Sequence, residues 1–275
     1  MTLATQNLSQ RFPGKRVFIT GAASGLGLAI AESLAREGWR LILTDADAER
    51  LSVVVASLQN QGVAAIAAPC DVRDATALQA LVDNAMLIAQ GIDVAIHAAG
   101  VAAAGPFYST TTEDWQWVFD VNVHGVVNSC KAVVPIMRKA GTGLIINIAS
   151  AASFCTGANM SIYNSAKAAV VALSETLMQE LKPDGVQVVA AMLGFFRTRL
   201  LDSARGPDKV LVGARRIMEG SNLDAATVAE YLLAAAARGR THVVYPSRYQ
   251  NLWRLKRAFP QGFQTLFPRL ADRSK

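Results

Sequence analysis

Short apolar runs rich in β-branched residues alternate with longer helical segments along almost the whole 275-residue chain. The runs predict strands at 16–20, 40–44, 64–68, 92–96, 143–148, 186–191 and 241–245, and the segments predict helices at 26–37, 47–60, 75–90, 113–139, 163–182 and 225–238. Strands that alternate with helices need crossover connections, which give a parallel sheet with helices on both faces. We therefore expect an α/β fold with a doubly wound, seven-stranded parallel sheet, in a single domain over residues 1–275.

A glycine-rich turn follows the first expected strand directly and opens the first helix. It reads Thr20-Gly21-Ala22-Ala23-Ser24-Gly25-Leu26-Gly27. Glycines let a backbone turn tightly and approach a diphosphate, and the helix N-terminus offers free N–H groups and a favourable dipole. Because the turn joins a strand to a helix, as a dinucleotide site requires, we expect a Rossmann-type cofactor site at Gly21, Ser24, Gly25, Leu26 and Gly27.

Asp45 ends the second expected strand, 18 residues after Gly27. A carboxylate there can accept hydrogen bonds from both hydroxyls of an adenosine ribose and repels a 2′-phosphate. No Lys or Arg directly follows Asp45 or precedes Gly25 to neutralise such a phosphate. The alternative role is a helix cap or turn residue, since Asp47 and Glu49 are close by. We expect NAD rather than NADP as the cofactor.

Three polar residues suited to proton transfer come later in the chain. Ser150 ends the fifth strand, and Tyr163 and Lys167 lie four residues apart, on one face of a helix. A nearby ammonium, with the positive charge of an oxidised nicotinamide, should lower the pKa of Tyr163 by stabilising its phenolate. That would make Tyr163 a general acid/base near neutral pH. Taken alone, the pair is also typical of an amphipathic helix face with a lysine that reaches solvent.

These motifs together resemble those of the short-chain dehydrogenase/reductase family, from about residue 14 to residue 245. The matching features are the glycine turn, Asp71-Val72 after the third strand, Asn122 in Val121-Asn122-Val123, Ser150, and Tyr163-Asn164-Ser165-Ala166-Lys167. Ser150 precedes Tyr163 by 13 residues, a common spacing in that family.

The resemblance implies a catalytic role for four of these residues. Tyr163 would exchange the hydroxyl proton with the substrate, and Ser150 would orient the substrate oxygen. Lys167 would hold the nicotinamide ribose and tune Tyr163. Asn122 would fix a water that relays protons through Lys167 to solvent.

The resemblance also extends to the adenine side of the cofactor site, with one departure. Asp71 and Val72 would flank the adenine.

Where the family usually has Asn-Asn-Ala-Gly, this chain has His97-Ala98-Ala99-Gly100. Ala99 and Gly100 remain, so the close backbone approach to the cofactor should remain too. We expect His97 to be a structural histidine that satisfies a local backbone group.

The loops after the strands carry large apolar residues, and in open α/β sheets these loops set substrate specificity. Phe154, Met160, Phe195 and Phe196 predict an apolar pocket, although each could equally pack under a lid. Residues 194–220 are long enough to form that lid. It begins at Leu193-Gly194 where the family usually has Pro-Gly, a change that frees the backbone and could loosen the positioning of nicotinamide.

Charge and composition exclude several classes of function. The net charge of +6 lies in residues 246–275, so the balanced body argues against general nucleic-acid binding. Cys70, Cys130 and Cys155 are too few and too scattered for a disulfide framework or a metal motif, which favours a reducing compartment and no metal. We see no signal peptide and no apolar run of ~18 residues, so we expect a cytoplasmic protein.

The basic C-terminal tail, residues 246–275, is amphipathic. Apolar residues recur in it at helical spacing: Leu252, Leu255, Phe259, Phe263, Leu266 and Leu270. Pro260 and Pro268 should split the segment into short helices. The tail could lie on an anionic membrane as a peripheral contact, or pack on the body or on a neighbouring subunit.

The expected function is hydride transfer between NAD and a secondary alcohol or its ketone, with an apolar, steroid-like or lipid-like substrate. The alternative is a non-catalytic NAD-sensing or regulatory protein on the same fold, because a fold does not fix a function. The complete set of Asn122, Ser150, Tyr163 and Lys167 argues against that alternative, since a pure binder has no need for a tuned phenol. The resemblance also implies a homodimer or homotetramer formed through the helices at 113–139 and 163–182.

Overall fold

The computed structural model describes residues 7–272, with side chains described up to residue 267. Seven strands form one sheet in the order β3-β2-β1-β4-β5-β6-β7, and every neighbouring pair is parallel. The strands are β1 (Arg16–Thr20), β2 (Arg40–Thr44), β3 (Ala65–Ala67), β4 (Val94–His97), β5 (Gly143–Ile148), β6 (Val186–Leu193) and β7 (His242–Tyr245). The strand order reverses between β1 and β4, so the predicted doubly wound, single-domain fold is confirmed.

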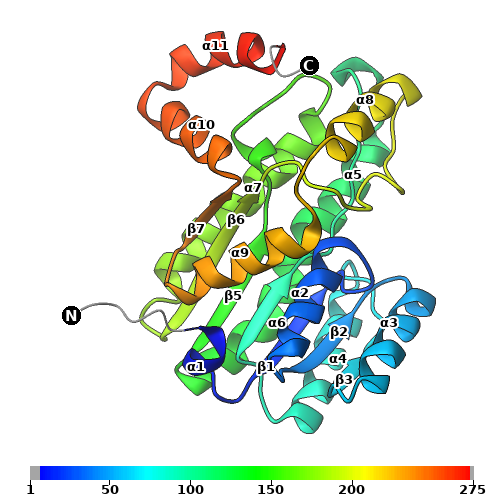
Figure 1. Cartoon of the computed structure of the whole chain (residues 1–275), viewed down its shortest axis with the longest axis vertical. Helices are drawn as coiled ribbons and strands as arrows, with labels where there is room; N and C mark the ends of the chain where they lie inside the picture. The colour runs from blue at the N-terminus through cyan, green and yellow to red at the C-terminus, as the bar shows by residue number, and fades with distance from the viewer. Residues whose placement is uncertain (1–6, 273–275) are drawn as a thin grey trace.

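Helices cover both faces of this sheet (Figure 1). They are α1 (Leu8–Arg11), α2 (Gly25–Arg36), α3 (Ala48–Asn60), α4 (Ala75–Ala89), α5 (Thr112–Phe119), α6 (Gly125–Ala140), α7 (Ser161–Glu180), α8 (Asp208–Glu219), α9 (Ala225–Ala237), α10 (Ser247–Ala258) and α11 (Pro260–Asp272). Three short turns complete the order: η1 (Phe107–Ser109), η2 (Asp120–His124) and η3 (Ala151–Ser153).

Alternate strand residues build two separate core layers. Val17 and Ile19 of β1 belong to the layer beneath α2, α3 and α9, whereas Phe18 between them belongs to the layer beneath α4, α6 and α7. Successive side chains of a strand point to opposite faces, so one strand supplies both layers. Burial on both faces explains why the strands read as nearly continuous apolar runs.

Two of the sequence expectations need correction in this part of the structure. The single helix expected at 113–139 is interrupted by the π-helical turn η2, which contains Asn122. Such turns insert a residue into an α-helix and are frequent at functional sites. The expected lid also contains a helix, α8, which the sequence pattern did not indicate because it buries only Leu211 and Met218, seven residues apart.

The C-terminal tail forms α10 and α11, which project beyond β7 at the top of Figure 1. The predicted break at Pro260 is present, but α11 continues through Pro268; a proline removes one helical hydrogen bond and can bend a helix without ending it. Leu252 packs against the core layer beneath α4, α6 and α7, and Phe263 is buried, whereas Phe259 and Leu266 are exposed. The side chain of Leu270 lies outside the described residues.

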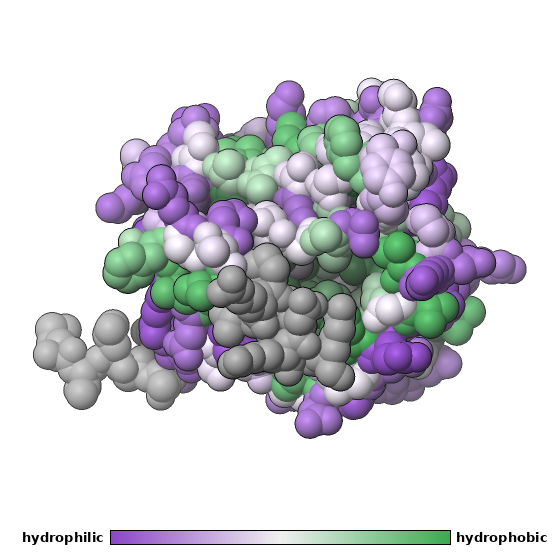
Figure 2. Space-filling view, turned by 90° about the horizontal axis from the view of Figure 1, so that it is seen from above, coloured by the Kyte–Doolittle hydropathy of each residue, from purple (hydrophilic) through white to green (hydrophobic). Residues whose placement is uncertain are grey.

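The carboxyl ends of the strands and the tail lie at the same end of the molecule. Figure 2 looks onto this end and shows apolar patches on the surface, interspersed with polar residues. Within the described residues, no helix combines the length and the hydropathy needed to cross a bilayer.

Candidate active site

The turn between β1 and α2 has no room for a side chain at its glycine positions. Gly21 and Gly25 have φ values of +67° and +55°, which favour glycine. A Cβ on Gly21 would lie 2.6 Å from the backbone nitrogen of Ala99, and a Cβ on Gly27 would overlap the carbonyl oxygen of Gly21. Ser24, which precedes α2, makes no side-chain capping bond in the described structure. The first N–H groups of α2 are therefore left for an anion such as a diphosphate.

Asp45 lies beside this turn, at the end of β2. Its Oδ2 accepts a hydrogen bond from the Ala23 N–H at 3.0 Å, and its Oδ1 accepts one from the Asp47 N–H at 3.0 Å. Each carboxylate oxygen has a second acceptor position, so the group can still bind ribose hydroxyls. Asp47, and not Asp45, caps α3 by accepting from Arg50. The helix-cap alternative therefore applies to Asp47, whereas the bond from the Asp47 N–H gives Asp45 the role of a turn residue, which leaves room for a ribose contact.

Asp71 and Val72 follow β3 at the adjacent edge of the sheet. Asp71 forms an ion pair with Arg73 at 2.6 Å, and the hydrogen bond from Arg73 holds the pKa of Asp71 below its usual value. Val72 is buried against Gly125 at the start of α6, where a Cβ would collide with it. The geometry places both residues on the side where Asp45 lies, since Cys70 donates its N–H to the Asp45 carbonyl at 3.1 Å.

Ser150, Tyr163 and Lys167 come together where β5 ends and α7 begins. Lys167 Nζ donates to the Ile148 carbonyl at 2.9 Å and lies 5.7 Å from the centre of the Tyr163 ring. The Ser150 hydroxyl donates to the Leu193 carbonyl at 3.3 Å and accepts from the Ala152 N–H at 3.1 Å. Tyr163 and Lys167 are 7% and 5% exposed, so this is an enclosed pair and not the solvated helix face of the alternative reading.

Burial controls the protonation of this pair. It raises the pKa of Tyr163 to about 12, against the opposite influence of a hydrogen bond with Ser150, and it lowers the pKa of Lys167 to about 8. In the protein alone, desolvation of the phenolate outweighs its stabilising contacts, so the lowered tyrosine pKa that we expect depends on the positive charge of an oxidised nicotinamide. A cation bound beside the phenol would lower the pKa of Tyr163.

Asn122 is fully buried in η2 and is fixed by the backbone of Val101. Its Nδ2 donates to the Val101 carbonyl and its Oδ1 accepts from the Val101 N–H, both at 2.9 Å. A Cβ on Gly100 would lie 3.2 Å from Asn122 Oδ1 and 3.7 Å from Lys167 Nζ. Gly100 thus lies between the two side chains, and its lack of a Cβ keeps the space around Lys167 open.

His97 lies in a buried polar network beneath the cofactor edge of the sheet. Its Nδ1 is 2.8 Å from Asn147 Oδ1, and Asn147 Nδ2 donates to Ser174 Oγ at 3.0 Å. The partner is a side chain, which corrects our expectation of a backbone group: β4 and β5 are in register at His97 and Asn147. His97 Nε2 has no hydrogen-bond partner among the described residues. Burial lowers the pKa of His97 to about 4.

This histidine should make the protein sensitive to acid. The unfolded chain takes up the His97 proton near pH 6.5, whereas the folded protein takes it up only near pH 4, so stability is lost as the pH falls between these values. In the wild type this loss lowers the free energy of unfolding by about 3 kcal/mol at pH 4, and we expect His97→Asn to abolish it. Urea unfolding of both proteins at pH 7 and pH 4 measures the difference. Equal losses in the two proteins would contradict the prediction.

An apolar cluster surrounds Tyr163 on its open side. Its buried members are Ala102, Tyr163, Leu201 and Met218, with Ala152, Met160, Phe195, Leu200, Ala204 and Ala214 packed around them. Met160 and Phe195 therefore lie where a pocket lining was expected. Phe154 instead belongs to the core layer beneath α4, α6 and α7, and Phe196 packs against the other core layer. Leu201 and Met218 carried no local signal, since their proximity to Tyr163 depends on how the lid folds.

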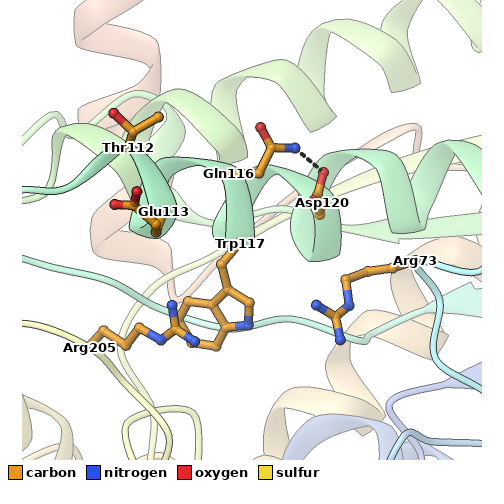
Figure 3. A pocket seen from close by; sticks show the side chains of 7 residues that line it. All are labelled: Arg73, Thr112, Glu113, Gln116, Trp117, Asp120 and Arg205. Carbon is orange, nitrogen blue, oxygen red and sulfur yellow. Dashed lines mark hydrogen bonds between the residues drawn. The ribbon is translucent and has the colours of Figure 1, made fainter.

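The lid, residues 194–220, is joined to the loop after β4. Arg205 donates its N–H to the Ala102 carbonyl at 3.1 Å, and its carbonyl accepts from Ala104 at 2.9 Å. Its guanidinium lies 4.0 Å from the ring centre of Trp117 on α5, on the edge of an open pocket to which Arg73 also contributes (Figure 3). The lid is therefore closed onto α5, next to the apolar cluster.

Sequence reasoning missed Thr198 in this segment. A Cβ on Gly25 would lie 2.7 Å from Thr198 Oγ1, so this hydroxyl lies directly over the glycine turn. A hydroxyl there can donate to a diphosphate or to an amide oxygen. Thr198 is more than 170 residues from the turn in the sequence, so no local pattern could have indicated that it belongs to the site.

Comparison with known proteins gives consistent results. The short chain dehydrogenase family model matches residues 15–208. The 2,3-dihydro-2,3-dihydroxybenzoate dehydrogenase of Bacillus subtilis is 33% identical over 208 residues, which are 76% of this chain and 78% of that protein. Dehydrogenase/reductase SDR family member 4 of Homo sapiens is 31% identical over 202 residues, covering 71% and 72% of the two chains.

Solved structures show the same similarity. A short chain dehydrogenase/reductase from Burkholderia phymatum in complex with NAD has a TM-score of 0.84 and 31% identity, covering 89% of this chain and 93% of that one. A short-chain dehydrogenase from Sphingobium yanoikuyae in complex with NADPH has a TM-score of 0.77 and 30% identity, covering 91% and 95%. A nicotinamide cofactor is common to both.

Proposed function

The chain belongs to the short-chain dehydrogenase/reductase family, and we propose that it transfers a hydride between NAD and a secondary alcohol or the corresponding ketone. The observation that carries the proposal is the enclosed pair of Tyr163 and Lys167 beside Ser150, at the carboxyl end of a sheet whose glycine turn can hold a diphosphate. A non-catalytic sensor would bury a phenol and an ammonium together at a cost in stability and with no use for either.

Each residue of the site has a distinct task in this proposal. A nicotinamide cofactor, when bound, accepts or donates the hydride. Tyr163 Oη takes the proton of the substrate hydroxyl during oxidation and returns it during reduction. The Ser150 hydroxyl turns its hydrogen from the Leu193 carbonyl to the substrate oxygen. The ammonium of Lys167 favours the phenolate, and Asn122 fixes the loop that carries Gly100 and Val101.

The remaining residues of the site would bind the cofactor. The turn at Gly21, Gly25 and Gly27 would receive the diphosphate, with Thr198 above it, and Asp45 would bind the adenosine ribose. Asp71 and Val72 would flank the adenine. Ala99 would allow close approach, because its backbone packs against Gly21.

A substrate screen tests the proposal directly. Purified protein is mixed with NAD or NADP and a panel of secondary alcohols, and with the reduced cofactors and the matching ketones, while the absorbance of the reduced cofactor is followed. We expect turnover with apolar cyclic alcohols, steroids among them, because the cluster around Tyr163 is apolar. Binding of NAD without turnover of any compound in the panel would favour the sensor function.

Cofactor choice depends on Asp45 in this proposal. We expect the wild type to have the higher kcat/KM with NAD, and Asp45→Ala combined with Ala46→Arg to shift the preference toward NADP by about tenfold or more. The double change removes a carboxylate that repels a 2′-phosphate and supplies a cation that binds one. Asp47→Ala is the matched control, because it removes a nearby carboxylate that caps α3. A wild-type preference for NADP would refute this role of Asp45.

We further propose a cytoplasmic homodimer or homotetramer in which the core spans about residues 14–245, with the lid and the tail as additions. The faces of α5, α6 and α7 supply the subunit contact. Three residues of the tail, Tyr249, Leu252 and Trp253, pack on the core layer beneath α4, α6 and α7, which favours attachment of the tail to the protein over attachment to a membrane. Light scattering of the purified protein measures the assembly.

A further inference from the structure

One tyrosine of the C-terminal tail packs against the end of β6. This strand ends at Leu193, and Gly194 follows. A Cβ on Gly194 would lie 2.8 Å from Tyr249 Cζ and closer still to Cε2 and Cδ2. The flat face of the Tyr249 ring therefore rests on the backbone of Gly194, and no residue other than glycine fits beneath it.

The backbone held by this ring also contacts the proposed catalytic serine. The Leu193 carbonyl accepts the Ser150 hydroxyl at 3.3 Å, and the Gly194 N–H donates to the Tyr245 carbonyl at 2.8 Å. Leu193 and Gly194 thus lie between Ser150 on one side and the tail on the other. A shift of this segment would move the wall of the site at which Ser150 and Tyr163 meet.

The tail makes a second contact with the same site. Lys256 Nζ donates to the carbonyl of Phe154 at 2.9 Å. Phe154 ends the short turn that begins at Ser150, so α10 fixes both the end of β6 and the loop after β5. Both Tyr249 and Lys256 contact backbone atoms. Such contacts fix the position of the wall of the site but add no reactive group to it.

The need for such support follows from the backbone itself. A leucine at position 193 does not lock φ as a proline ring would, and glycine, at position 194, is the most flexible residue type. We propose that Tyr249 is a positioning residue, whose ring holds Gly194 so that the end of β6 forms a fixed wall for the nicotinamide ring of the cofactor. The proposal rests on the function proposed above, because it requires a nicotinamide cofactor at Ser150 and Tyr163.

Binding measurements with a truncated cofactor test this role without a substrate. Isothermal titration calorimetry gives Kd for NADH and for ADP-ribose, which lacks the nicotinamide, in the wild type and in Tyr249→Ala. We expect Tyr249→Ala to weaken NADH binding about tenfold and to leave ADP-ribose binding within about twofold. Tyr249→Phe keeps the ring and should match the wild type with both ligands. Leu252→Ala, on the same helix and in the same core layer, is the matched control and should leave the ratio of the two Kd values unchanged.

The possible failures are distinguishable. A wild type that binds no pyridine nucleotide would refute the proposed function. A wild type that binds NADH, with a Tyr249→Ala variant that binds NADH as tightly or loses ADP-ribose equally, would refute the positioning role alone. If Tyr249→Ala does not fold by circular dichroism, Tyr249→Leu replaces it, since leucine fills the space without a flat face; an unchanged ratio of Kd values in that variant would overturn the proposal.

Discussion

We expect Tyr163→Phe to lower kcat by about 10²–10⁴-fold while the Kd for NAD stays close to that of the wild type. The substitution removes Oη alone. The ring remains packed among Ala102, Leu201 and Met218, so the pocket keeps its shape. Because burial raises the pKa of Tyr163 to about 12, the neutral phenol already predominates in the protein alone, and its replacement removes a hydrogen bond with Ser150 but no charge. The loss should therefore appear in the chemical step.

Single-turnover absorbance and calorimetric binding of NAD separate these effects. Tyr231→Phe is the matched control, because Tyr231 lies on α9, stacks on Tyr245 with ring centres 4.0 Å apart, and is not part of the cluster around Tyr163. That control should keep its kcat. If Tyr163→Phe retained most of the wild-type kcat, another group would have to transfer the proton, and the proposed mechanism would be wrong.

Short sequence patterns were enough to predict the strands of the sheet and the residues at its cofactor-binding edge. The strands expected at 16–20, 40–44 and 143–148 have the same bounds in the structure, because buried parallel strands are apolar throughout and end at polar or glycine-rich turns. The glycine turn was visible because its conformation restricts the residue type at each position. Ser150, Tyr163 and Lys167 were recognisable because they lie close together in the sequence as well as in space.

The features that the sequence did not reveal depend on contacts between distant segments. Leu201 and Met218 reach Tyr163 only because the lid is closed, and Tyr249 reaches Gly194 only because α10 packs back on the sheet. Asn122, in the π-helical turn, is hydrogen-bonded to Val101, 21 residues earlier. The raised pKa of Tyr163 depends on burial, which an i,i+4 spacing does not report.

The change Lys167→Met should lower kcat by at least about 10²-fold and raise stability near neutral pH. Burial lowers the pKa of Lys167 from 10.5 to about 8, so below pH 8 the folded protein carries a poorly solvated ammonium. The unfavourable contribution is about 3 kcal/mol there, offset in part by the hydrogen bond to Ile148 that the variant loses. We therefore expect the free energy of unfolding at pH 7 to rise by about 1–3 kcal/mol.

The pH dependence tests the cause of this effect. Between pH 8 and 10.5 the unfolded chain still binds the Lys167 proton and the folded protein does not, so the wild type gains stability with rising pH across this window. The Lys167→Met variant lacks that gain, and its advantage should shrink as the pH approaches 10.5. Lys182→Met, at an exposed position, is the control for the change in net charge and should alter stability by less than about 0.5 kcal/mol. An advantage for Lys167→Met that stays constant from pH 7 to 10.5 would mean that improved packing, and not the removal of a buried charge, stabilises the variant.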